Sequence, residues 1–205
     1  MRIVISLFCA LLLSGCWDGK ELNDRAYVNT LAIDKTKDSE YRVCISISDI
    51  AQQEGGGHED DSKDRNKGTK EHRGSSVMEA INECERRTSR SLFFGHLQAV
   101  LFGKELLSDR DMFLEALAAL EQNSEFSRKM MILAGEDIEI CEMTPAGEPS
   151  LGAYAVSFYK KDRTGETFEL TLEELLISIS KTGSAVIPKI EEDEGEILLR
   201  GSYQF

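Results

Sequence analysis

The stretch LQAVLF, residues 97–102, is a short apolar run that ends at Gly103, and the stretch MMILA, residues 130–134, repeats the pattern. Short apolar runs that end at a turn residue are typical of strands buried on both faces of a sheet. Between the two runs, a helix is expected to begin at Ser108, with Asp111 in its first turn. The order of strand, helix and strand predicts an α/β protein with at least part of its sheet parallel.

Upstream of these runs, the pattern predicts a hairpin and a second helix. Residues 41–48 alternate apolar and polar side chains with period two, which indicates a half-buried strand. Residues 27–34 predict its partner strand, because the polar segment 35–40 suits a hairpin turn. A capping box at residues 76–79 begins an amphipathic helix that is expected to reach about Arg90.

Downstream, the pattern predicts further helices and strands. Helical segments are expected at 136–143, at 151–159 and from the cap at Thr171, and strands at 185–190 and from 197. The helix at 151–159 carries an aromatic stripe, which we interpret as core or interface packing rather than a ligand face. Pro188 indicates that its strand lies at an edge or at an exit from the sheet.

These elements predict a mixed sheet with helices packed on it, formed by an N-terminal α/β domain over residues 27–190. Residues 191–205 are expected to start a following domain that is missing from the chain. Residues 51–76 contain one alanine and no larger apolar side chain, so we expect a mobile, solvated loop. Its histidines, His58 and His72, lack the spacing of metal ligands, so no metal site is predicted there.

The first residues of the chain match a bacterial lipoprotein signal. Arg2 precedes an apolar run at residues 3–13, which is too short to cross a bilayer of about 30 Å as a helix. The small pair at residues 14–15 stands directly before Cys16, as in a lipobox. We therefore expect residues 1–15 to be cleaved and Cys16 to carry a diacylglyceryl group, with residues 16–26 as a membrane-proximal tether.

Composition limits the partners of the chain. Its 24 basic and 37 acidic residues give a net charge of −13, and loss of Arg2 with the signal makes this −14. A chain of this charge is repelled by nucleic acid and by anionic headgroups, so membrane attachment is expected to come from the lipid on Cys16. Beyond the lipobox the cysteines are Cys44, Cys84 and Cys141. An odd number cannot form a closed disulfide framework, so at least one is expected to be a small buried side chain.

No catalytic motif is recognisable in the sequence, and no cofactor is predicted. Outside the expected loop, His96 is the one histidine available as a general base. A pair with Ser89 or Ser91 is conceivable, but a histidine at a strand edge is more often a hydrogen-bonded structural residue. From the residues alone, the chain is predicted to be an anchored, extracytoplasmic α/β interaction module.

Three groups of residues near the start of the chain occur in an order that carries a family resemblance. They are Cys16-Trp17-Asp18, Glu21-Leu22-Asn23-Asp24 and Ile33-Asp34-Lys35. In this order they resemble the opening of the spore germinant-receptor C-subunit lipoproteins. Weaker matches follow in sequence at residues 78–81, residues 94–98, Ser127-Arg128 and residues 187–190. Members of this family are longer than this chain, so the resemblance covers their N-terminal portion.

The resemblance implies a non-enzymatic subunit on the outer face of the inner spore membrane. Such a subunit assembles with polytopic partners into a nutrient receptor that triggers germination, and the partners rather than this subunit are expected to hold the nutrient. Under this interpretation His96 and Arg128 make structural or partner contacts, with a structural pair favoured for Arg128. The alternatives are a solute-binding lipoprotein of a transporter and a lipid-anchored hydrolase that uses His96.

Overall fold

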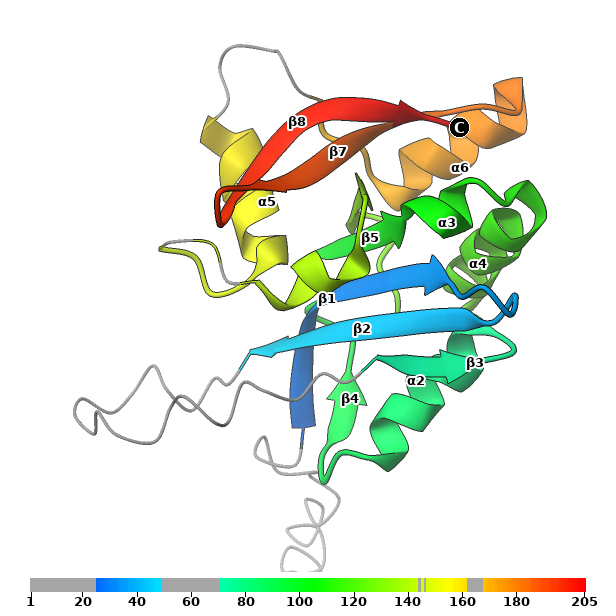
Figure 1. Cartoon of the computed structure of the whole chain (residues 1–205), viewed down its shortest axis with the longest axis vertical. Coiled ribbons are helices and arrows are strands. Elements are labelled where there is room, and N and C mark those ends of the chain that lie inside the picture. Colours follow the sequence, from blue (N-terminus) through cyan, green and yellow to red (C-terminus); the bar gives the residue numbers. More distant parts are fainter. Residues whose placement is uncertain (1–24, 49–70, 144, 146, 162–167) are drawn as a thin grey trace, which may run out of the picture.

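A mixed sheet forms the centre of the computed structural model, which describes residues 25–48, 71–143, 145, 147–161 and 168–205 (Figure 1). Eight strands of the described residues pair in the order β3-β2-β1-β5-β6-β7-β8, with β4 beside the start of β1. The strands are β1 Arg25–Lys35, β2 Tyr41–Ser48, β3 His72–Gly74, β4 Ser91–Phe93, β5 Ala99–Gly103, β6 Met131–Gly135, β7 Val186–Asp193 and β8 Glu196–Gln204. The helices are α2 Val77–Arg86, α3 Lys104–Leu107, α4 Arg110–Gln122, η3 Ile138–Glu142, α5 Leu151–Lys161 and α6 Leu172–Thr182.

The middle of the sheet is parallel and its flanks are antiparallel. β5 pairs in parallel with β1 and with β6, and β6 pairs in parallel with β7. Every residue of β5 and of β6 is buried, which confirms the interpretation of the two apolar runs as central strands. Antiparallel pairing adds β2 and β3 on one side and β8 on the other. The predicted α/β fold with a mixed sheet and packed helices is therefore confirmed.

Helices cover both faces of the sheet and create two apolar layers. Leu31 and Ile33 of β1 point into the layer that is covered by α2, α4 and α6. Ala32, between them, points into the opposite layer, which is covered by η3 and α5. Successive strand residues face opposite sides, so β1 contributes to both layers and is buried along most of its length.

Side-chain oxygens set the helix starts, but one start differs from the prediction. Ser76 caps α2 as predicted, but the Glu79 carboxylate of the predicted capping box accepts from Ser75 N. Thr171 caps α6 in a full capping box. The helix expected from Ser108 begins two residues later as α4, which Asp109 caps by accepting a hydrogen bond from Met112 N, and Ser108 instead ends the short preceding helix α3. The helix that was expected to reach Arg90 ends at Arg86, because the chain must turn to enter β4.

The end of the predicted 51–76 loop is ordered. Residues 72–74 form β3, which pairs with β2, and His72 is buried at 6% exposure. The prediction of a loop that continues to residue 76 is therefore wrong at this end. Three residues are too few to show the alternation of apolar and polar side chains that indicates a strand. Residues 72–74 form a strand because they pair with β2. Residues 49–70, which hold the rest of that prediction, lie outside the described residues.

The C-terminal segment belongs to the same sheet. Residues 191–205, which we expected to begin a following domain, hold the end of β7 and the strand β8, and β8 pairs along β7 in an antiparallel hairpin. Phe205 packs on Phe113 of α4 with ring centroids 4.5 Å apart, and its backbone exchanges hydrogen bonds with Ala185. Pro188 does not mark an edge, since β7 lies between β6 and β8 and the proline stands at a register shift.

The predicted signal, residues 1–15, and most of the predicted tether lie outside the described residues. The tether was expected to extend to residue 26, but Arg25 already begins β1. None of the helices in the described part of the chain combines the length and the apolar character needed to cross a membrane.

Candidate functional site

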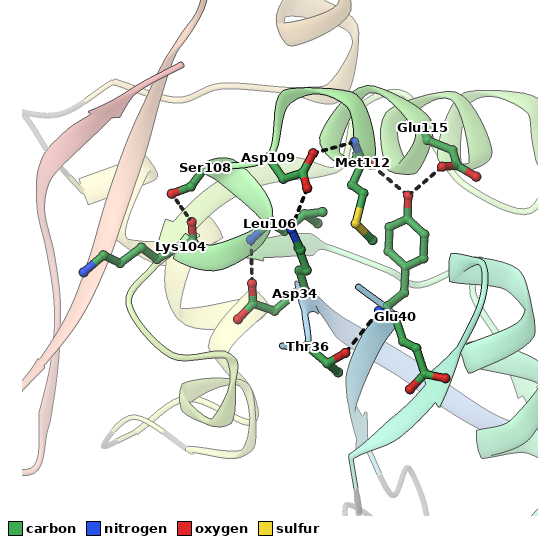
Figure 2. A network of polar contacts seen from close by, with 11 residues as sticks. Asp34, Thr36, Glu40, Lys104, Leu106, Ser108, Asp109, Met112 and Glu115 are labelled. Atoms are coloured by element: carbon green, nitrogen blue, oxygen red, sulfur yellow. Dashed lines mark hydrogen bonds and ion pairs between the residues drawn. The ribbon is translucent and has the colours of Figure 1, made fainter. Parts of the chain in front are cut away.

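The carboxyl end of β1 carries a buried acid. The Asp34 side chain is 1% exposed and accepts a hydrogen bond from the backbone N–H of Leu106 at 2.8 Å, as Figure 2 shows. Arg42 of β2 donates to the other carboxylate oxygen at 2.9 Å. The helix α3 begins after Gly103, which has no side chain to cap it, so Asp34 caps it from the neighbouring strand.

Gly103 provides the space for the Asp34 carboxylate, and Arg42 provides the positive charge that pairs with it. A Cβ atom at Gly103 would overlap the Asp34 carboxylate, so this position requires glycine because of close approach. Burial acts to lower the pKa of Arg42, but its hydrogen bond to Asp34 and the charges of Asp34, Glu71 and Asp137 act against burial and raise that pKa overall. The guanidinium therefore stays charged beside the buried carboxylate.

Two further contacts tie the β1–β2 hairpin to α4. Lys35 pairs with Asp109, the residue that caps α4, at 2.5 Å. The Tyr41 hydroxyl donates to Met112 O at 2.9 Å and to a Glu115 carboxylate oxygen at 3.1 Å. Burial first, and then the Glu115 carboxylate, raise the pKa of Tyr41 above its ordinary value. The hydroxyl therefore remains a hydrogen-bond donor throughout the physiological pH range.

The remaining carboxyl ends of the parallel strands are also joined by ion pairs. Glu136, which follows β6, contacts Lys189 of β7 at 2.9 Å and Lys104 of α3 at 3.1 Å. Both lysines lower the pKa of Glu136, and Lys189 has the larger effect. Open α/β sheets commonly bind ligands at this edge. In this protein the ion pairs at the edge connect strands and helices, which favours a structural role for it.

The residues that sequence reasoning singled out lie at the opposite edge, at the amino ends of β5 and β6. A shallow hollow of about 510 Å³, here called the His96 hollow, is formed there by the segments before the two strands and by α5. Its lining includes His96, Gln98, Ser127, Lys129, Ala153 and Glu169. The structure thus brings together two segments that carried the family resemblance, residues 94–98 and 127–128.

His96 itself lies in the turn before β5 and is exposed. Its ring packs against Tyr27 and Phe93, with centroid distances of 5.3 and 5.9 Å. No hydrogen bond joins His96 to Ser89 or Ser91, all three of which are described. The contacts are therefore those of a surface aromatic cluster, and no nucleophile and base pair is assembled.

Arg128 lies beside the hollow and not in its lining. Its guanidinium pairs with Glu121 of α4 at 2.9 Å, and the Arg128 side chain is 58% exposed. Its backbone carbonyl accepts a hydrogen bond from Glu173 N at 3.0 Å. A structural pair was favoured for Arg128, and its pair with Glu121 lies at the surface, where an ion pair contributes little to stability.

Sequence reasoning missed Gln98. Its side-chain oxygen is buried and has no hydrogen-bond partner among the described residues, although it lines the His96 hollow. The available signal was a lone polar residue inside the otherwise apolar run at residues 97–102. An unpartnered buried oxygen is costly, so this oxygen is a group that a hydrogen-bond donor entering the hollow could pair with.

Two other predictions concern the lipidation of Cys16 and the binding of a metal ion. Cys16 lies outside the described residues, so its lipidation stays a prediction. In the part of the chain that the structure describes, no three or more histidine, cysteine, aspartate or glutamate side chains are grouped to hold a metal ion.

Comparison with known proteins gives one family and several relatives. Residues 18–192 match the spore germination protein N-terminal domain. The chain is 34% identical over 110 residues to the putative spore germination protein YfkR of Bacillus subtilis (strain 168), a match that covers 53% of this chain and 28% of the relative. Spore germination protein KC of that organism is 29% identical over 124 residues, covering 60% of this chain and 30% of the relative.

Spore germination protein A3 of Bacillus subtilis (strain 168) matches nearly the whole chain. It is 23% identical over 209 aligned residues, which cover 98% of this chain and 54% of the relative. The chain therefore spans about half the length of this relative, and its matches span under a third of the other two. No solved structure matches the chain. Because the matched domain spans residues 18–192, well over half of the chain, the chain belongs to the family of spore germination proteins that share this N-terminal domain.

Proposed function

We propose that the protein is a lipid-anchored, non-enzymatic subunit of a nutrient germinant receptor. In this role it is held on the extracytoplasmic face of the inner spore membrane and assembles with polytopic partner subunits. The observation that carries the proposal is the match of residues 18–192 to the spore germination protein N-terminal domain. That match begins two residues after the lipobox cysteine, Cys16, so the domain directly follows the predicted anchor.

The anchor supplies the membrane attachment in this proposal. The mature chain is acidic, so its protein surface is repelled by anionic headgroups. A diacylglyceryl group contributes about 0.8 kcal/mol for each buried CH₂, and two acyl chains satisfy the two-signal requirement for stable anchoring. The α/β domain is then free to present its sides to partner proteins in the same membrane.

The geometry supports partner contact through the region of the His96 hollow. His96 and Arg128 are both exposed, and they lie in or beside the hollow that contains the unpartnered Gln98 oxygen. The opposite edge of the parallel strands is occupied by ion pairs around Asp34 and Glu136. The described strands also form a single sheet, whereas a solute-binding lipoprotein builds two lobes around a cleft. These observations favour a receptor subunit over the transporter alternative.

Replacement of the lipobox cysteine tests the anchor. We expect Cys16→Ala protein to remain an uncleaved precursor or to leave the membrane fraction after a high-salt wash, and spores that carry it to lose nutrient-triggered germination. Cys9→Ala is the matched control, because this cysteine lies inside the signal and should leave anchoring unchanged. If Cys16→Ala protein is processed and retained like wild type, the anchor proposal is wrong.

Co-purification tests the assembly. The tagged full chain, solubilised from spore membranes, should bring polytopic receptor subunits with it. Arg128→Glu should reduce this recovery several-fold without changing the melting temperature, because the side chain is on the surface. Arg87→Glu, which disrupts a comparable exposed pair with Glu83 on α2, is the control and should assemble normally. Recovery of the chain without any polytopic protein would contradict the proposed role.

A further inference from the structure

Two of the three described cysteines lie against each other under η3. Cys44 of β2 is 3% exposed and Cys141 of η3 is fully buried. The Cys141 thiol donates to the Cys44 carbonyl oxygen at 3.6 Å, so its sulfur lies directly against the Cys44 residue. Both side chains belong to the apolar layer that η3 and α5 cover. The fold thus brings together two sulfur atoms whose residues are 97 positions apart in the sequence.

The third cysteine has no such neighbour. Cys84 of α2 is buried in the other apolar layer, on the opposite face of the sheet. All three thiols are free in the structure. The arrangement therefore selects one pairing out of the three that three cysteines allow.

We propose that Cys44 and Cys141 form a disulfide bond in the exported protein, which ties η3 to β2 and leaves Cys84 as a thiol. A bond of this kind persists in an oxidising compartment, and the lipobox places the domain outside the cytoplasm. The proposal requires export of the chain but does not depend on its role in a receptor. It also explains how an odd number of cysteines is accommodated, since the single remaining thiol is buried.

The oxidant is a disulfide, either that of an exported thiol–disulfide oxidoreductase or oxidised glutathione. One cysteine thiolate attacks the oxidant, which breaks the oxidant S–S bond, releases one thiolate and leaves a mixed disulfide. The second cysteine thiolate then attacks the mixed disulfide, forms the Cys44–Cys141 bond and releases the other thiolate. The protein loses two protons and two electrons, and the oxidant gains them as two thiols.

The reaction is expected during folding, before η3 docks on β2. The pKa of the Cys44 thiol is raised in the folded protein, first by its hydrogen bond with Cys141 and then by burial, with the Glu142 carboxylate adding to the rise. Since the thiolate is the nucleophile, the docked pair reacts slowly. The same burial protects the finished bond from reductants until the protein unfolds.

Peptide mapping tests the pairing directly. The full chain is exported in cells, purified from membranes, treated with N-ethylmaleimide in denaturant and digested with trypsin. We expect residues 43–63 linked to residues 130–160, at the summed mass less two hydrogens, and the maleimide on Cys84 in residues 74–86. Exported protein with the maleimide on both Cys44 and Cys141, or with a bond to Cys84, would overturn the proposal.

Thermal unfolding gives a second, independent measurement. The oxidised protein should melt about 5–15 °C above the same protein unfolded and refolded in dithiothreitol, because the bond closes a long loop. Cys84→Ala should keep this difference and Cys141→Ala should abolish it. If Cys141→Ala does not fold, the comparison of oxidised and reduced wild type still decides. Equal melting temperatures for a verified disulfide form and its reduced form would refute the stabilising role.

Discussion

Asp34 and Gly103, on the neighbouring strands β1 and β5, each depend on the identity of the other. A carboxylate with 1% exposure is costly unless it is paired, and Arg42 together with the Leu106 N–H supplies the partners. Gly103 leaves the space that the carboxylate occupies and, having no side chain, leaves the start of α3 to be capped by Asp34. The aspartate of the family-like Ile33-Asp34-Lys35 motif therefore links β1, β2 and α3 at one point.

Removal of this acid should destabilise the domain strongly. Asp34→Ala removes the shortest ion pair of Arg42, leaves it only the 3.8 Å pairs with Glu71 and Asp137, and leaves α3 uncapped, so the free energy of unfolding should fall by about 3 kcal/mol. Asp34→Asn keeps an oxygen that can accept from Leu106 N, so its loss should be smaller. Urea denaturation of the purified protein measures both. Asp38→Ala, in the exposed turn nearby, is the control and should change stability by less than about 0.5 kcal/mol. Equal stability of Asp34→Ala and wild type would contradict the assignment.

Cys84 provides a pH-dependent prediction. Burial, with Glu85 adding to it, raises the pKa of the Cys84 thiol to about 11 in the folded protein. The unfolded thiol titrates near pH 8.5, so the folded state holds this proton more tightly. Its contribution to stability is therefore complete below about pH 8.5 and is lost as the pH rises towards 11.

The Cys84→Ala variant should show a melting temperature that falls less steeply than that of wild type between pH 8.5 and 11. A residual slope should remain, because the pKa of Tyr41 is raised as well. Val77→Ala, on the same buried face of α2, is the control that lowers stability without removing a titrating group. Parallel curves for Cys84→Ala and wild type would show that the thiol does not contribute.

At the scale of elements, capping oxygens decide where helices begin. The sequence indicated Ser108 as the start of this helix, but the structure shows that Asp109 caps α4, since its carboxylate accepts from Met112 N and pairs with Lys35. Both contacts lower the pKa of Asp109, and the contact with Lys35 has the larger effect. Ser108 makes a different bond, donating to Lys104 O at the end of α3.

The two neighbouring residues allow a matched test of the cap. Asp109→Ala should lower the melting temperature by about 2–4 °C, because α4 loses its cap and Lys35 loses its partner. Ser108→Ala should cost less, since it removes one exposed bond at the end of a four-residue helix. Differential scanning calorimetry of the two variants distinguishes the assignments. A larger loss for Ser108→Ala would restore the helix start that the sequence suggested.

The elements that the sequence predicted well are those with a period or a continuous apolar run. β2 was predicted with its bounds, and β5 and β6 were predicted within two residues at each end. β3 and β4 were missed, because three residues such as HRG or SLF carry no period and become strands only through pairing with β2 and β1.

The contacts of Asp34 could not be derived from sequence spacing, since its partner Leu106 is 72 residues away and meets it only in the folded sheet. His96 and Arg128 were found, but their exposure was not predictable.

At the scale of the whole molecule, a parallel centre is closed by an antiparallel hairpin on each side. β1 and β2 close one side, with β3 beyond them, and β7 and β8 close the other. The family match ends at residue 192, before β8 begins at Glu196, yet β8 pairs with β7 and buries Ile197 and Leu199. The sheet therefore extends beyond the family domain as matched, and β8 covers what would otherwise be an open strand edge.

The pairing of β8 with β7 predicts that a chain shortened by removal of residues 194–205 is less soluble than the full chain. Without residues 194–205, β7 presents an unpaired edge, and Phe113 loses the ring of Phe205. Exposed edges of this kind promote association between chains. The shortened protein should therefore melt several degrees lower and scatter more light than the full chain at equal concentration. Phe205→Ala isolates the packing contribution, and its free energy of unfolding should fall by about 1–2 kcal/mol with no increase in scattering. A shortened protein that stays monodisperse and melts like the full chain would show that β8 is dispensable for the fold.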